Sequence, residues 1–466
     1  MKLITKWVER LTKSDWSIRC LMLSVIIAMS ISAGHFNIGK NNGMDEGFLW
    51  ASLGALIFLL MLLLLWNRPT HPTPQPPIAI QKIHTKTRWL AVFLGFFALA
   101  LLAEINGKVF KIRELLSVSS HLQFALWVGG ICLLATGFAG WRYTWGEKQT
   151  KSGKTKRVRV AIHEKTFRQH LVSMPRIEVI GVLVILIFAT ITRSIQLETL
   201  ARLWIDEIHF SNPVLHFNIN TNIDLLIPFS SVAAFPYVFP YMQWHFVELI
   251  GWNLVGLRAF SVVLGVVNVL AVYLLARELF NRRVAMVAAL ALAALPIHIQ
   301  FSRIALNNIV DPLLGTLTFY FIIRGLNRPH QIRGNFAWAG AMLGLTQYFY
   351  EGGRFLFPVL TLGLFGLLGS WSYIRYIRPM ITPAILNKSK RPDIIARLPK
   401  INPMPIIRAG IILWVVAVCV GAPVYYTLIA RNQGVAARLD TAGVSDKTIN
   451  TFDSPDAVVK HVFNRL

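Results

Sequence analysis

The sequence predicts an all-α, polytopic integral membrane protein with about eleven transmembrane helices. Of its 466 residues, 55% are hydrophobic and only 15% are charged, whereas a soluble domain carries roughly 25% charged residues. Several runs of about 17 to 21 mainly apolar residues are long enough to cross a hydrocarbon core of roughly 30 Å. The three cysteines, Cys20, Cys132 and Cys419, each lie in an apolar run and offer neither a disulfide framework nor a metal site.

The apolar runs divide the chain into modules. They predict helices over residues 20–36, 48–66, 89–106, 122–141, 177–194, 258–276, 284–301, 304–323, 335–350, 355–374 and 409–429. We expect four parts: an N-terminal four-helix membrane module (1–145), a basic cytoplasmic loop (146–176), a membrane core (177–430) and an outer C-terminal tail (431–466). The first run is short enough to be mistaken for a signal peptide, but its cleavage would not change the sidedness of later helices.

The distribution of charge sets the expected orientation. A net charge of +25 in a soluble domain would suggest nucleic-acid binding, but in a polytopic protein Lys and Arg gather in cytoplasmic loops. A cytoplasmic N-terminus places most basic residues inside, in segments 1–19, 67–88, 142–176, 277–283, 324–333 and 375–408. The same orientation places outside the charged residues Asp206, Glu207, Arg258, Arg303, Asp311, Glu351 and Arg354. We therefore expect no nucleic-acid partner, and a location in the plasma (inner) membrane.

The outer loop at 195–257 is the largest outside segment before the tail. It mixes proline and aromatic residues, and from about 243 to 256 polar and apolar residues alternate at helical spacing. Such a segment predicts one or two helices lying in the membrane interface, which would roof a cavity there. The basic stretch 146–170 is expected to lie on anionic headgroups.

Asp206 and Glu207 are the leading candidates for chemistry. An acidic pair beside a helix is most often simply solvated, but this pair follows Trp204 and Ile205 rather than a polar loop. Adjacent residues on a helix do not share a face, so one can react while the other supports it. A carboxylate in apolar surroundings is a stronger base than one in water. We expect one of the two to abstract a proton.

Three outside arginines at helix ends, Arg258, Arg303 and Arg354, are candidates for binding an anion. Arginines at helix ends commonly snorkel to the interface, yet arginine is rarer outside than inside. A guanidinium binds phosphate through a bidentate fork, so a lipid phosphate would fit them. Asp311 follows Asn307 and Asn308 in an apolar segment, and is either a costly intramembrane charge or the start of a late helix. Four histidines could serve as metal ligands together with carboxylates, but no tight ligand spacing links them: His209, His216, His245 and His298.

The order of short motifs then resembles a known family. After the Asp206–Glu207 pair come the stretches PYMQWH (240–245), GLRAFS (256–261), ARELFNRR (276–283), PIHIQFSR (296–303), YFYEGGR (348–354) and APVYY (422–426). Over residues 178 to 445 the chain resembles the GT-C superfamily of polytopic glycosyltransferases. The resemblance is nearest to the bacterial branch related to protein O-mannosyltransferases and the lipid A aminoarabinose transferase.

The resemblance implies a GT-C fold and a sugar transfer from a polyprenyl-phosphate donor at the outer face. The acceptor would be a hydroxyl of a protein or a lipid. By resemblance, Asp206 matches the catalytic base, and Glu207 supports it or helps to bind a divalent cation. Arg303, Arg258 and Arg354 would hold the donor phosphate, with Tyr241, His245 and Asp311 also in the donor site. The chain departs from the family in its four leading helices and in ending at Leu466, so we expect a truncated product or a second chain that completes it.

Two rival functions remain at this point. Intramembrane charges also mark transport routes, so a transporter or lipid flippase is one alternative. Transporters usually carry internal repeats and helices broken at the midplane, and the sequence shows neither. A truncated, inactive scaffold is the other alternative. The sequence does not identify the sugar, the acceptor or a metal requirement.

Overall fold

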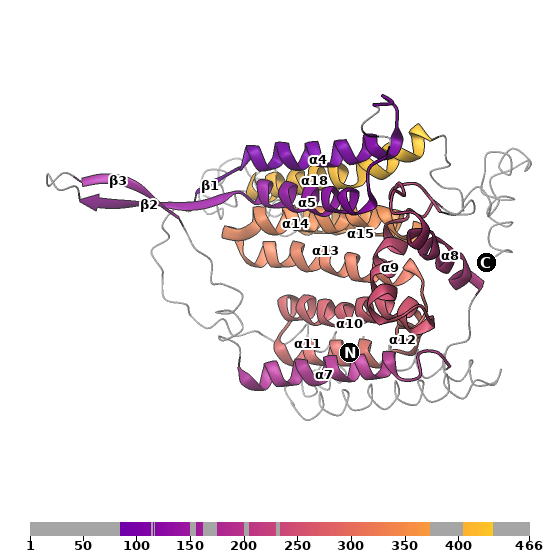
Figure 1. The fold of residues 1–466 in the computed structure, drawn as a ribbon. Helices are drawn as coiled ribbons and strands as arrows, with labels where there is room; N and C mark the ends of the chain where they lie inside the picture. Colours follow the sequence, from indigo (N-terminus) through magenta and orange to yellow (C-terminus); the bar gives the residue numbers. More distant parts are fainter. Residues whose placement is uncertain are drawn as a thin grey trace, which may run out of the picture. The chain divides into compact units, whose positions relative to one another are not determined.

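The computed structural model describes residues 84–112, 115, 117–149, 155–161, 175–199, 205–229, 234–372 and 404–431. These residues form mainly long helices (Figure 1). The expected helices at 20–36 and 48–66 lie outside the described residues, as do most of the loop 375–408 and nearly all of the tail after residue 430.

Most of the described helices follow the predicted apolar runs, whereas the helices Ile205–Ile219 (α8) and Val238–Ile250 (α9) lie within the expected outer loop 195–257. They are α4 (Trp89–Gly107), α5 (Ser120–Ala139), α7 (Arg176–Ser194), α8 (Ile205–Ile219), α9 (Val238–Ile250), α10 (Leu254–Leu279), α11 (Arg282–Ala294), α12 (Pro296–Ser302), α13 (Val310–Asn327), α14 (Ile332–Leu345), α15 (Glu351–Ser372) and α18 (Met404–Ala430). Within the described residues six helices are long and apolar enough to cross a membrane, or seven if the bent pair α11–α12 is one span. The chain is therefore a polytopic helical membrane protein, and the total of about eleven spans stays a prediction.

One predicted helix, 284–301, is broken in the structure. The helices α11 and α12 meet at a bend of 63°. Pro296 is the first residue of α12 and Leu295 before it is extended, with φ −69° and ψ 116°. Proline lacks an N–H group and disfavours the helical conformation in the residue before it. The break therefore results from Pro296, whose effect on the backbone a hydropathy average does not indicate.

A three-stranded antiparallel sheet was not predicted. It joins β1 (His84–Lys86), β2 (Trp141–Gln149) and β3 (Thr155–Ala161) in that order. The strand β2 begins in the last residues of the expected N-terminal module (1–145) and ends in the expected basic loop 146–176, and β3 lies within that loop. Residues 157–160 alternate arginine and valine, which is the period of a strand. The all-α class therefore describes the membrane helices but not this sheet.

The described chain divides into two compact units. Of the described residues, unit 1 comprises those that fall within Met1–Lys86, Trp141–Ser211 and Met242–Ile309, and unit 2 comprises those that fall within Thr87–Gly140, Asn212–Tyr241 and Val310–Leu466. In unit 1, α7 packs on α10 and α11, and the core is rich in alanine, which lets the helices approach closely. Glu178 at the start of α7 accepts hydrogen bonds from Tyr273 (2.6 Å) and Arg277 (2.8 Å) near the end of α10.

In unit 2, α14 packs against both α13 and α18, and α4 packs against α5 and α18 (Figure 1). A side chain at Gly340 of α14 would collide with the backbone oxygen of Leu413 in α18, and one at Gly344 would collide with Val420 and Ala417. These glycines allow the close crossing of α14 and α18. The helices α4 and α5 thus share one compact unit with α14 and α18, so this part of the expected N-terminal module packs with later helices.

Candidate functional site

The two acidic residues Asp206 and Glu207 lie in the first turn of α8 and face opposite environments. Asp206 is exposed, whereas Glu207 is 0% exposed. Successive residues on a helix point about 100° apart, because 3.6 residues make one turn. Glu207 is thus held in the protein interior while Asp206 faces outward from the same turn.

Glu207 forms a fully buried ion pair with Arg258 of α10. The guanidinium donates from Nε to Oε1 (2.8 Å) and from Nη2 to Oε2 (2.6 Å), and both side chains are 0% exposed. The backbone N–H of Ala305 donates a third bond to Oε1 (2.8 Å). A fork of this kind fixes both groups in distance and orientation, so Glu207 anchors the first turn of α8.

Local structure places Arg258 at this position. The side chain of Asn253 caps α10 by accepting from the N–H of Gly256 (2.9 Å), as N-cap residues do. Arg258 follows in the second turn and also donates from Nη1 to the carbonyl oxygen of Leu197 (2.7 Å). One guanidinium therefore links the start of α8 to the segment that follows α7.

Arg303, just after α12, binds the end of α7 through main-chain carbonyls. It donates to the oxygens of Thr192 (3.0 Å), Ile195 (2.6 Å) and Gln196 (3.0 Å). Burial lowers the pKa of Arg303, and the nearby charge of Arg258 lowers it further. Arg258 is already paired with Glu207, so Arg303 adds a second positive charge near the pair.

The other expected site residues have different surroundings. His245 is an exposed residue of α9 in unit 1, and its ring lies 4.8 Å from that of Trp244. Tyr241 belongs to unit 2 and is buried, with its hydroxyl 2.7 Å from Nδ1 of His121. Burial raises the pKa of the Tyr241 hydroxyl.

Asp311 and Arg354 lie together in unit 2. Arg354 is buried and donates to the carbonyl oxygens of Gln347 (2.9 Å) and Ala234 (2.5 Å). Asp311 is buried at the start of α13, directly against the first turn of α15, where a side chain at Gly353 would collide with its carboxylate. A carboxylate at a helix N-terminus is favoured by the helix dipole, which gives Asp311 a structural role at α15.

The structure therefore gathers Asp206, Glu207, Arg258 and Arg303 in unit 1, with His245 on the surface of the same unit. Tyr241, Asp311 and Arg354 belong to unit 2. Sequence reasoning missed Arg193 of α7, which is fully buried. The signal was available, because an arginine inside the apolar run 177–194 is a costly intramembrane charge.

The surroundings of Glu207 do not fit a cation ligand. Both carboxylate oxygens face the guanidinium of Arg258, and Oε1 also accepts from Ala305. A divalent ion there would stand against a fixed positive charge. In the part of the chain that the structure describes, no three His, Cys, Asp or Glu side chains gather as metal ligands.

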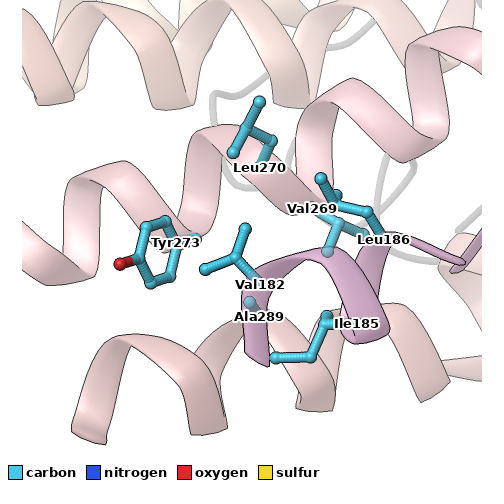
Figure 2. A pocket seen from close by; sticks show the side chains of 7 residues that line it. All are labelled: Val182, Ile185, Leu186, Val269, Leu270, Tyr273 and Ala289. Carbon is cyan, nitrogen blue, oxygen red and sulfur yellow. The ribbon is translucent and has the colours of Figure 1, made fainter. Parts of the chain in front are cut away.

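A crevice in unit 1 is apolar. It lies between α7, α10 and α11 and is too narrow for a water molecule; its lining residues are Val182, Ile185, Leu186, Val269, Leu270, Tyr273 and Ala289 (Figure 2). Its one polar group, the Tyr273 hydroxyl, donates to Glu178. The crevice therefore belongs to the helix packing and offers no group for catalysis.

Comparison with known proteins gives a class for the chain. A family model described as dolichyl-phosphate-mannose-protein mannosyltransferase matches residues 235–381. The matched stretch includes Tyr241, Arg258, Arg303 and Arg354 but begins after Asp206. No curated protein and no solved structure matches the chain. Together with the spanning helices, the match supports a membrane glycosyltransferase of the mannosyltransferase type.

Proposed function

We propose that the chain transfers a sugar, with mannose the first to test, from a polyprenyl-phosphate donor to an acceptor hydroxyl at the outer face of the membrane. The acceptor belongs to a protein or a lipid. The observation that carries the proposal is the exposed Asp206 beside the buried, anchored Glu207. The family match, which lies downstream of this pair, supports the same reaction class.

Asp206 is the proposed catalytic base. It takes the proton of the acceptor hydroxyl, and the acceptor oxygen attacks the anomeric carbon of the sugar. The bond between that carbon and the phosphate oxygen breaks, and polyprenyl phosphate leaves with the bonding electrons. Attack opposite the leaving group inverts the anomeric centre. General-base catalysis of this kind typically contributes about 10²- to 10⁴-fold.

Glu207 supports the base without reacting, because its oxygens are held by Arg258 and Ala305. Arg303 provides positive charge that favours the anionic donor and stabilises the charge growing on the leaving phosphate. Arg258 contributes indirectly, by holding Glu207. Arg354, Tyr241, His245 and Asp311 remain proposed donor-site residues, for which the family resemblance is the argument.

The proposal is tested by comparing cells with and without the gene. Mass spectrometry of glycoproteins and glycolipids should show a hexose on a hydroxyl acceptor that disappears on deletion and returns with the intact gene. An unchanged glycan profile, with altered distribution of a lipid between leaflets, would favour a flippase instead.

A further inference from the structure

Two buried arginines in unit 1 connect the end of α7 with the end of α12 through hydrogen bonds. Arg193 lies in the last turn of α7 and reaches α11 and α12, and Arg303 follows α12 and reaches back to α7. We call these two side chains and the groups they bind the arginine clasp. Arg193 has no part in the reaction described above, and Arg303 enters that reaction only as a source of positive charge.

Arg193 binds the end of α11, where the proline break frees backbone carbonyls. It donates to the oxygens of Ala293 (3.1 Å) and Leu292 (3.3 Å). A helix end leaves its last carbonyls without partners inside the helix, and the N–H missing at Pro296 adds to this deficit. Arg193 therefore satisfies acceptors that the bend at α11–α12 creates.

The same guanidinium also holds α12. It donates from Nη2 to Nδ1 of His298 (2.9 Å) and from Nε to Oγ of Ser302 (3.3 Å). A side chain at Gly265 of α10 would collide with Ser302, so this glycine makes room for the contact. Arg193 is 0% exposed, and every acceptor found for it among the described residues is neutral. Burying a charge costs much free energy unless the charge is hydrogen-bonded, so these acceptors stabilise Arg193 where it lies.

Arg303 completes the clasp from the other side. One of its three carbonyl acceptors, Thr192, lies in the last turn of α7. The other two, Ile195 and Gln196, belong to the turn that follows. Gln196 has a φ of 48°, a left-handed conformation that is unfavourable for a residue other than glycine. Bonds to the carbonyls on either side of that unfavourable φ hold the turn in place.

The clasp is connected to the acidic pair by two short routes. Leu197, next to Gln196, accepts from Arg258, and Arg258 binds Glu207. Ala305, two residues after Arg303, donates directly to Glu207. Both routes end on the carboxylate that anchors the first turn of α8, next to Asp206.

We propose that the arginine clasp positions Asp206, so that Arg193 is a positioning residue for sugar transfer although it touches no substrate. This inference rests on the proposed function for its kinetic consequence. Its structural part is that Arg193 fixes α12 through His298 and Ser302 and thereby positions Arg303, which binds the carbonyls of the turn at 195–199. Small misplacement of a catalytic group is costly, since about 1 Å can lower a rate by roughly 10²-fold.

The test compares Arg193→Met and Arg193→Lys with the unchanged full chain in lipid nanodiscs. Hydrogen exchange is read at the amides of Ile195 and Thr199, which donate to Ile191 (3.0 Å) and Gln196 (3.2 Å). We expect exchange about tenfold faster in Arg193→Met, because each lost charged hydrogen bond loosens the local structure. Arg193→Lys keeps the charge but not the fork, and should give an intermediate rate.

The kinetic arm uses synthetic polyprenyl-phosphate mannose. We expect kcat to fall about tenfold in Arg193→Met while KM for the donor changes by less than about twofold, since a positioning defect acts on the chemical step. Arg333→Met is the matched control: Arg333 of unit 2 donates to the end of α5 at Phe138 (2.7 Å). It should lower stability without changing exchange at 195–199 or kcat measured below the unfolding temperature.

Three results would overturn the clasp. The first is unchanged hydrogen exchange at 195–199 in both Arg193 variants. The second is hydrogen exchange at 195–199 that is accelerated as much in Arg333→Met as in Arg193→Met. The third is a raised KM for the donor with an unchanged kcat in Arg193→Met. If Arg193→Met does not fold, Arg193→Lys decides by the same exchange readout. Absence of transfer by the unchanged chain refutes the proposed function, whereas the exchange rates separately decide whether Arg193 holds the turn.

Discussion

Replacing Glu207 by glutamine should destabilise the protein strongly although it exchanges only one carboxylate oxygen for an NH2 group. Glu207 and Arg258 are both 0% exposed and share two bonds of 2.8 and 2.6 Å. Removing the charge leaves Arg258 buried without its counter-ion. Breaking a buried pair in this way costs about 3–5 kcal/mol, a large share of a typical stability of about 5–15 kcal/mol.

The magnitude is expected near the lower end of that range. The glutamine amide keeps an oxygen that accepts one bond, either from Arg258 or from the N–H of Ala305. The Leu197 carbonyl continues to accept from the guanidinium (2.7 Å), and its dipole stabilises part of the positive charge. We therefore expect a loss of about 3 kcal/mol in the free energy of unfolding.

The assay is reversible unfolding of the full chain in mixed micelles, followed by circular dichroism. Glu248→Gln is the matched control, because Glu248 is an exposed carboxylate on α9 of the same unit; its cost should stay within about 0.5 kcal/mol. Replacing both partners, as Glu207→Leu with Arg258→Met, should recover at least about 2 kcal/mol relative to Glu207→Gln. A cost below about 1 kcal/mol for Glu207→Gln would refute the buried pair as the anchor of α8.

Three further outcomes follow from the packing and the caps. Gly340→Leu should cost about 1–3 kcal/mol or prevent folding, because the new side chain meets Leu413; Gly363→Leu, where nothing lies within 4 Å, should be tolerated, and equal damage in both would count against the crossing. Asn281→Ala should cost about 1 kcal/mol in thermal unfolding, because Asn281 caps α11 through bonds of 3.0 and 3.2 Å; no change would mean the cap is unimportant. Burial raises the pKa of Tyr241, so the unfolded chain loses this proton first and the stability it contributes falls as pH rises above about 10. Tyr241→Phe should flatten that part of the stability–pH curve, and an unaltered slope would show that Tyr241 does not cause it.

Hydropathy predicted the helices of this protein better than their breaks. The expected 89–106 and 177–194 became Trp89–Gly107 and Arg176–Ser194, because a run of apolar residues long enough to span a membrane has to satisfy its backbone internally. The bend before Pro296 was missed because hydropathy averages over a single proline. The strand β3 was missed because the arginines that alternate with valine at 157–160 were counted only as charge.

The candidate site shows which features a sequence can predict. Helical geometry alone separates Asp206 from Glu207, since neighbours on a helix point in different directions, and the structure has one exposed and one buried. The pairing of Glu207 with Arg258, 51 residues away, depends on tertiary packing that no local pattern encodes. Arg303 was expected to bind phosphate, yet its described bonds all go to backbone carbonyls of α7 and the following turn.

The most direct test of the central claim is the transfer rate of Asp206→Asn, measured with the full chain in lipid nanodiscs. The donor is synthetic polyprenyl-phosphate mannose and the acceptor a serine- and threonine-rich peptide or a glycolipid with free hydroxyls. Loss of the base should lower kcat by at least about 100-fold, with donor binding and unfolding temperature unchanged because Asp206 is exposed. An Asp206→Asn variant that transfers mannose at the rate of the unchanged chain would contradict the account.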